Sequence, residues 1–298
     1  EIRFSEREIS WLFLLCIISS LILYFVNGSN LYHDNRYSGS SSVVLTYSNM
    51  IMTIILYLIL MLTQKKIKLI IKLIMLSAAI FLLLETNTKG PLLSFLLCIP
   101  FIIYLDRKLF TPIILVITVS SMLIYFSPLS SRISSFVESI STIDSKNITN
   151  STSKNFSENE RIYYYFFSVT QILDNPLMGI GPGNYEETIK KQIESDNLNI
   201  TVSDHAHNDF LDISVKFGII TTSMFISILI YFFIIFLKSQ NSYISRCGII
   251  TIVSQVGYML TQSQFAHNQA IVFFFFLLYL FLSQISELNK KNNYIEDN

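Results

Sequence analysis

Eight long apolar runs dominate this sequence of 298 residues. A helix needs about 20 mostly apolar residues to cross the hydrocarbon core of a membrane, and each run approaches that length. Membrane-spanning strands would alternate apolar and polar residues, whereas these runs are apolar on every face. The sequence therefore predicts an all-α polytopic bundle of about eight membrane helices. The runs lie near residues 11–27, 43–62, 67–84, 90–105, 109–126, 217–237, 247–262 and 269–286.

The charges between these runs predict the orientation in the membrane, because short cytoplasmic loops retain Lys and Arg. One side collects most of the basic residues of the loops and ends, namely Arg3, Arg7, Lys65, Lys66, Lys68, Lys72, Arg107, Lys108, Lys238, Arg246, Lys290 and Lys291. We expect this side to be cytoplasmic. Residues 1–126 then form five spans, 127–216 one long extracytoplasmic loop with short helices, and 217–298 three spans and a cytoplasmic tail.

The composition excludes nucleic acid as a partner, since 21 basic residues are balanced by 21 acidic ones and leave no overall positive field. The catalytic or binding chemistry is expected in the outer loop, the only long hydrophilic segment.

Two helices are predicted within that loop. The first runs from about 158 to 173, because Ser157-Glu158-Asn159-Glu160 has the form of a capping box and Pro176 disfavours helical geometry at Asn175. Its aromatic series 163–167 is suited to the lipid headgroup level. A turn follows over Gly179–Gly183. The second helix should begin near Asp204, with Ser203 or Asp204 as its cap, and continue into the span at 217.

The strongest local feature is the series His205, Ala206, His207, Asn208, Asp209 at the outer mouth of that span. A helix that starts near 204 would hold both imidazoles in its first turn, where the partial positive charge of the helix end disfavours protonation. A neutral imidazole is what a general base needs. The alternatives are two surface histidines and a metal site. Residues two apart on a helix point about 200° apart, which argues against the metal site.

Three outer-face cations are candidates for binding a diphosphate: Arg161, Arg36 and Lys89. A guanidinium offers planar, bidentate hydrogen bonding to phosphate oxygens. The alternative for Arg161 is a surface salt bridge or a headgroup contact, and Lys89 could equally pair with Glu85 four residues earlier. His267 and His33 are interpreted as interfacial residues only.

The joint pattern of three blocks resembles the bacterial O-antigen ligase-like family, which includes O-antigen ligases and polymerases of O-antigen, capsule and exopolysaccharide. The blocks are Arg161–Tyr165, the segment 174–185 (DNPLMGIGPGNY), and 205–211 (HAHNDFL) followed by Gly218-Ile219-Ile220. Arg36 with Gly39 is similar to an Arg-x-x-Gly element of an earlier outer loop. Lys89-Gly90 stands where many members carry Ser-Arg-Gly, and is a departure from that pattern.

This resemblance implies a GT-C-like glycosyltransferase that works at the outer face of the bacterial cytoplasmic membrane without a metal or other cofactor. The donor would be an undecaprenyl-diphosphate oligosaccharide and the acceptor a glycan. His207 maps to the base, and Arg161 and Arg36 map to the diphosphate-binding cations, with Lys89 as a further one and His205, Asn208 and Asp209 in support. A flippase and chain-length regulators would be candidate partners.

A polymerase is favoured over a ligase because no signal specific to lipid A is present. Two functions from other classes remain open. A lipid-linked glycan transporter would place its ionisable groups near the bilayer midplane, whereas here they gather at the outer edge. A metal-dependent membrane hydrolase would use the two histidines.

Overall fold

The computed structural model describes residues 6–27, 32–33, 36–39, 41, 43–64, 67–127, 129–130, 133–134, 156–239 and 243–296. Nearly all of them are helical, and the strands are a two-residue antiparallel pair, β1 (Tyr32–His33) and β2 (Arg36–Tyr37). The predicted all-α polytopic fold is thereby confirmed. Most of the outer segment between 127 and 157 lies outside the described residues.

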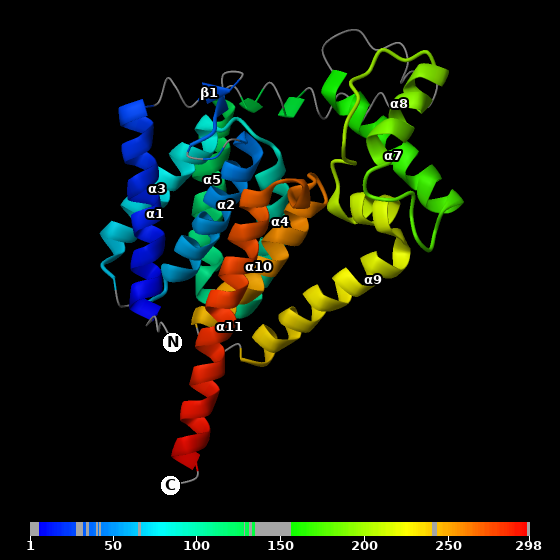
Figure 1. Cartoon of the computed structure of the whole chain (residues 1–298). Helices are drawn as coiled ribbons and strands as arrows, with labels where there is room; N and C mark the ends of the chain where they lie inside the picture. The colour runs from blue at the N-terminus through cyan, green and yellow to red at the C-terminus, as the bar shows by residue number, and fades with distance from the viewer. Residues whose placement is uncertain are drawn as a thin grey trace. The chain divides into compact units, whose positions relative to one another are not determined.

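Each of the eight predicted spans corresponds to a helix (Figure 1). These are α1 (Glu6–Asn27), α2 (Val44–Met61), α3 (Leu69–Glu85), α4 (Gly90–Leu105), α5 (Phe110–Tyr125), α9 (Asp209–Lys238), α10 (Tyr243–Met259) and α11 (Asn268–Glu296). Short 3₁₀ turns η2 (Arg107–Leu109) and η3 (Gln264–Ala266) precede α5 and α11. Among the described residues, five helices, α1, α2, the η2–α5 segment, α9 and α11, are long and apolar enough to cross a membrane, and α4 is a shorter apolar helix.

The described chain divides into two compact units. The helix-bundle unit comprises Glu1–Leu129, Tyr231–Tyr258 and Asn268–Asn298, and the histidine unit comprises Ser130–Ile230 and Met259–His267. The helix-bundle unit is organised around α2, which contacts α1, α3, α4 and α11 and is 89% buried along its apolar stretch. A helix that is apolar on all faces is stable in this central position.

Neutral polar side chains join α2 to α10. Asn49 donates from Nδ2 to Oε1 of Gln255 (3.0 Å), and the Gln255 amide donates in return to Thr53 Oγ1 (3.3 Å). One turn away, the Tyr57 and Thr251 hydroxyls are 2.5 Å apart. Hydrogen bonds of this kind hold membrane helices together where lipid supplies no hydrophobic drive.

Lys72 caps the end of α2 rather than lying in a loop. Its ammonium donates to the backbone carbonyls of Met61 (2.9 Å), Leu62 (3.0 Å) and Gln64 (2.6 Å), and the residue is buried. Carbonyls at a helix C-terminus lack intrahelical partners and favour a cation. The predicted cytoplasmic excess of positive charge therefore includes one residue with a structural role of its own.

The histidine unit has a small hydrophobic core of its own. Helix α7 (Phe156–Asp174), helix α8 (Tyr185–Ser195) and the start of α9 bury a shared set of side chains, which are Tyr164, Phe167, Tyr185, Ile189, Ile193, Ala206 and Val215. The predicted first loop helix is confirmed, including its end before Pro176. Its aromatic series was assigned to the headgroup level, and for Tyr164 and Phe167 that is wrong, because they are core residues with 2% and 6% exposure.

The capping box predicted at the start of α7 involves the Ser157 side chain, which lies outside what the structure describes, and α7 is described from Phe156. The Glu160 carboxylate accepts a hydrogen bond from the backbone N–H of Thr201 (2.6 Å), so it ties α7 to the segment after α8.

A turn between α7 and α8 packs on a kink in α9, and glycines make the contact possible. Gly218 has φ +83° inside α9, and a Cβ there would lie 1.9 Å from the carbonyl oxygen of Leu177. The N–H of Ile180 donates to the Val215 carbonyl (2.8 Å), and the N–H of Ile219 donates to the Pro176 carbonyl (2.8 Å). The turn thus binds backbone groups that the kink leaves without helical partners. Gly179–Gly183 is a turn, as the sequence predicted.

Candidate functional site

Helix α9 begins at Asp209, with Asn208 as its cap. Asn208 Oδ1 accepts hydrogen bonds from the N–H groups of Phe210 (3.0 Å) and Leu211 (3.1 Å), as a capping Asn does. Its amide also donates to the carbonyl of Leu260 (3.1 Å). The prediction of a helix from near Asp204 is wrong, since the favourable cap lies four residues later.

The two histidines therefore precede the helix. Ser203, one of the two caps expected from the sequence, forms a local turn: its Oγ donates to the carbonyl of His205 (2.8 Å) and accepts from the His205 N–H (3.3 Å). Such side-chain bonds to nearby backbone compete with helix formation. Neither imidazole therefore lies in the first turn of the helix, where the sequence had placed them.

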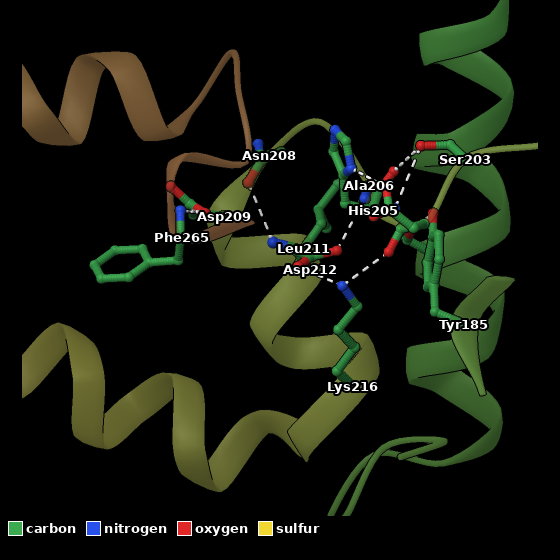
Figure 2. Close-up of polar contacts among 12 residues, drawn as sticks. Tyr185, Ser203, His205, Ala206, Asn208, Asp209, Leu211, Asp212, Lys216 and Phe265 are labelled. Carbon is green, nitrogen blue, oxygen red and sulfur yellow. Dashed lines mark hydrogen bonds and ion pairs between the residues drawn. The ribbon is translucent and has the colours of Figure 1, made fainter. Parts of the chain in front are cut away.

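The first turns of α9 hold the loop of residues 203–208, which we call the histidine loop (Figure 2). Asp212 accepts from the N–H of Ala206 (2.9 Å) and pairs with Lys216 (2.9 Å). The Lys216 ammonium also donates to the carbonyl of Asp204 (3.0 Å) and lies 5.4 Å from the ring centroid of Tyr185. The Asp212–Lys216 ion pair thus positions the loop through the backbone N–H of Ala206 and the backbone carbonyl of Asp204.

His207 occupies the centre of this loop in a left-handed conformation, with φ +54°. Its ring stacks on Tyr164, with centroids 5.6 Å apart and planes tilted by 28°, and its carbonyl accepts from the Tyr165 hydroxyl (3.1 Å). The ring of His205 lies 4.3 Å away. A non-glycine residue at positive φ is uncommon, and such strain gathers at functional sites. His207 Nδ1 is buried and has no hydrogen-bond partner in the described part of the chain.

The pKa of His207 is lowered from 6.5 to about 3, mainly because burial removes the ring from water. The charges of His205 and Arg161 also contribute to this lowering. Hydrogen bonding to Gln262 and the charge of Asp204 oppose the shift only in part. The imidazole is therefore neutral at neutral pH, for a reason that differs from the one expected from the sequence.

His205 lies between two other titratable groups. Its Nδ1 is hydrogen-bonded to the Asp204 carboxylate. Partial burial alone would raise the pKa of Asp204, but this bond and the charge of His205 bring it below its ordinary value. On its other side, His205 is 6.2 Å from the ring of His267, whose pKa is lowered by burial and by the charge of His205.

Asp209 is buried and connects α9 to η3. Its two carboxylate oxygens accept from the N–H groups of Gln264 (2.9 Å) and Phe265 (3.0 Å), as Figure 2 shows for Phe265. This contact fixes the segment that contains Gln262 and His267 beside the start of α9, next to the histidine loop. Asp209 therefore has a positioning role in the geometry of the cluster.

Arg161 lies on α7 within electrostatic reach of the loop, since its charge lowers the pKa of both His207 and Tyr165. The side chain is half-buried. Among the described residues its guanidinium makes no ion pair or hydrogen bond, and a guanidinium can offer five donors to a ligand.

The two other predicted cations belong to the helix-bundle unit. Arg36 is half-buried on β2 opposite His33, and Lys89 immediately precedes α4. Glu85, the alternative partner of Lys89, is the last residue of α3. The roles of Arg36 and Lys89 stay predictions.

Sequence reasoning missed Asp212, Lys216 and Gln262, and it interpreted His267, which lies beside His205, as an interfacial residue only. The Asp212–Lys216 spacing is a helix signal that could have been found. Gln262 and His267 follow a further span, and no spacing rule connects them to His207. The geometric objection to a metal site also fails, because His205 and His207 are not on a helix. Even so, the described residues contain no group of three or more His, Cys, Asp or Glu arranged to hold a metal ion.

Comparison with known proteins bears on the family. The O-antigen ligase family matches residues 74–226, just over half of the chain. This chain belongs to the O-antigen ligase family. The O-antigen ligase match includes Lys89, Arg161 and the whole histidine loop, and Arg36 lies before it. With its long apolar helices, this O-antigen ligase family member is an integral membrane protein.

A protein of Haemophilus influenzae, described as uncharacterized, is 27% identical to the chain over 190 residues. The similar region covers 60% of this chain and 46% of that protein. The chain thus spans about half the length of the curated relative that it matches.

Proposed function

We propose that this chain is a polysaccharide polymerase, which joins undecaprenyl-diphosphate-linked oligosaccharide repeats at the outer face of the bacterial cytoplasmic membrane. His207 would act as the base on the acceptor hydroxyl, and Arg161 would bind the donor diphosphate. The observation that carries the proposal is a neutral, half-buried imidazole whose Nδ1 has no partner among the described residues and which lies within electrostatic reach of the Arg161 guanidinium. Membership of the O-antigen ligase family supports the substrate class.

The reaction would proceed by attack of an acceptor hydroxyl oxygen on the anomeric carbon of the donor. The bond from that carbon to the diphosphate breaks, and the hydroxyl proton passes to His207. The diphosphate leaves with its negative charge, which a nearby guanidinium stabilises most strongly where water is partly excluded. Such a leaving group needs no metal to depart.

A base with a pKa of about 3 is weak, and the donor itself is proposed to correct this. A diphosphate near Arg161 neutralises the guanidinium charge that now lowers the pKa of His207. It also adds negative charge, which favours the protonated ring. The pKa of His207 would then rise toward the value at which general-base catalysis contributes about 10²- to 10⁴-fold. The base would be activated only when the donor is bound.

The test is an elongation assay with the full-length protein in detergent, a lipid-diphosphate oligosaccharide and a chelator. We expect His207→Gln to lower the rate of elongation by about 10²-fold or more, from the usual contribution of a general base. Arg161→Gln should lower it as well. Lys191→Gln, which changes an exposed cation on α8, is the matched control and should leave the rate unchanged.

Each outcome assigns a function. Longer glycans in the presence of chelator support the polymerase, and transfer only to a different glycan or lipid acceptor would identify a ligase. Loss of activity with chelator would favour a metal-dependent hydrolase, and lipid movement without elongation a transporter. Unaltered elongation by folded His207→Gln would remove the proposed base.

A further inference from the structure

Helix α7 has a second apolar face that its core does not use. Phe166, Val169 and Leu173 lie on one side of the helix at i, i+3 and i+7, and Leu177 and Met178 continue the series in the turn that follows. Their exposures run from 44% for Val169 to 81% for Met178. We call these five residues the α7 apolar face. A contiguous apolar surface of this kind on a protein marks an interaction site.

The α7 apolar face is continuous with the outer surface of a membrane span. The turn at Leu177 contacts the kink of α9 at Gly218, and the N–H of Ile219 donates to the Pro176 carbonyl (2.8 Å). Immediately beyond the kink, Ile219 and Met224 are exposed at 50% and 63% on the long apolar helix α9. Apolar side chains exposed on a membrane span are suited to contact with lipid, and the turn lies directly beside them.

The hydroxyl groups on both surfaces are bonded within their own helices and so are compatible with lipid. Thr170 on α7 donates to the carbonyl of Phe166 (3.0 Å). On α9, Thr221 donates to Phe217 (3.0 Å) and Ser223 to Ile219 (2.8 Å). Each of these hydroxyls has a partner within its own helix, as hydrocarbon would require.

We propose that the α7 apolar face lies in the membrane interface, with its side chains among the lipid acyl chains just below the headgroups. The ionisable Asp174 at the end of α7 is exposed and limits the depth to this shallow region. An apolar stripe along the side of a helix is typical of helices that lie in the membrane plane rather than across it.

This placement has a consequence for the site, and that consequence rests on the proposed function. Arg161 is twelve residues before Leu173, so a helix standing upright would hold its guanidinium about 18 Å above the interface. A helix lying in the plane instead holds Arg161 and the stacked Tyr164–His207 pair at headgroup depth. A lipid-linked diphosphate is found at that depth.

The experiment measures depth in proteoliposomes, using single cysteines at Leu173 and Met178 that carry an environment-sensitive fluorophore. Cys16→Ser provides the background, since Cys98 and Cys247 are buried. Lys191→Cys, exposed on α8, is the control. Quenching by lipids brominated near the headgroup is compared with quenching by lipids brominated near the chain ends and by aqueous iodide.

We expect shallow brominated lipids to quench the probes at 173 and 178 several-fold more than the probe at 191, which iodide should quench instead. Iodide quenching at 173 and 178 equal to that at 191 would overturn the proposal. Shielding from both lipid and iodide would also overturn it, because protein would then cover the face. Depth is read without glycan transfer, so this result and the elongation assay can fail separately.

Discussion

The α2–α10 contact and the histidine loop are both polar clusters inside helical surroundings, and they are built in opposite ways. At the α2–α10 contact, Asn49, Thr53 and Gln255 are neutral, buried and bonded to one another. In and around the histidine loop the groups are ionisable. Among the residues that the structure describes, the imidazole Nδ1 of His207 has no partner and the guanidinium of Arg161, on α7, makes no ion pair.

The difference separates a structural cluster from a binding site. A buried polar group without a partner costs about 1–3 kcal/mol, so a cluster that serves only stability completes its pairs. The α2–α10 contact has done so. The histidine loop pairs the groups that hold it, such as Asp212 with Lys216, and leaves Nδ1 of the His207 imidazole without a partner among the described residues. Within one site, positioning residues are paired and the candidate catalytic residue keeps one ring nitrogen available.

Asp209 should give the largest effect on stability, because it is a paired residue inside the histidine unit. Asp209→Ala leaves the N–H groups of Gln264 and Phe265 without acceptors and is expected to lower the free energy of unfolding by about 3 kcal/mol. Asp209→Asn retains one acceptor oxygen and should cost less. Unfolding by denaturing detergent in mixed micelles measures both.

The control for Asp209 is Asp174→Ala, which removes an exposed carboxylate at the end of α7. Equal stability of the Asp209 and Asp174 variants would show that the carboxylate does not hold η3. The positioning role assigned to Asp209 would then be lost.

Gln255→Leu should give the next largest effect, because it strands the Asn49 amide inside the bundle. We expect a loss of about 2 kcal/mol in the free energy of unfolding. The double variant Asn49→Leu/Gln255→Leu removes both partners and should recover most of that loss. Glycan elongation by the folded variants should stay within about twofold of the parent protein, since a structural cluster makes no transition-state contact. A large loss of elongation in the stable double variant would break the comparison.

The sequence predicted the elements whose signals are local. The apolar runs located the spans because each signal is contained in the helix itself, and Pro176 marked the end of α7. The predicted start of α9 was wrong because three residues that are good helix caps, Ser203, Asp204 and Asn208, lie within six positions. Only the folded contacts of Asn208 with Leu260 and of Asp212 with Ala206 decide among them.

Non-local contacts account for what the sequence could not predict. Helix α8 was missed although Tyr185, Ile189 and Ile193 recur every four residues, because its exposed side is strongly polar and the helix is short. Gln262 and His267 follow α9 and α10 in the sequence, and they reach the histidine loop only because the folded chain comes back to it. Burial of His207 by Tyr164 likewise depends on the fold, so its low pKa had no sequence signal.

Acidification should give the smallest effect and should be confined to the histidine loop. The folded pKa of His207, about 3, is below its unfolded value of 6.5, so the unfolded chain binds more protons between these values. This contribution to stability is complete above about pH 6.5 and is lost as the pH falls toward 3. Asp204 and His267, whose pKa values are also lowered, act in the same direction.

Unfolding at about pH 7 and about pH 5.5 should therefore differ in the parent protein by about 1 kcal/mol more than in His207→Gln. The Asn49→Leu/Gln255→Leu variant should keep the full pH dependence of the parent, because it removes no ionisable group. An unchanged pH dependence in His207→Gln would mean that the imidazole is solvated and protonates at its ordinary pKa. His207 would then not be a desolvated ring, and it would no longer contrast with the fully paired α2–α10 contact. The physical reason for assigning the base to His207 would be lost.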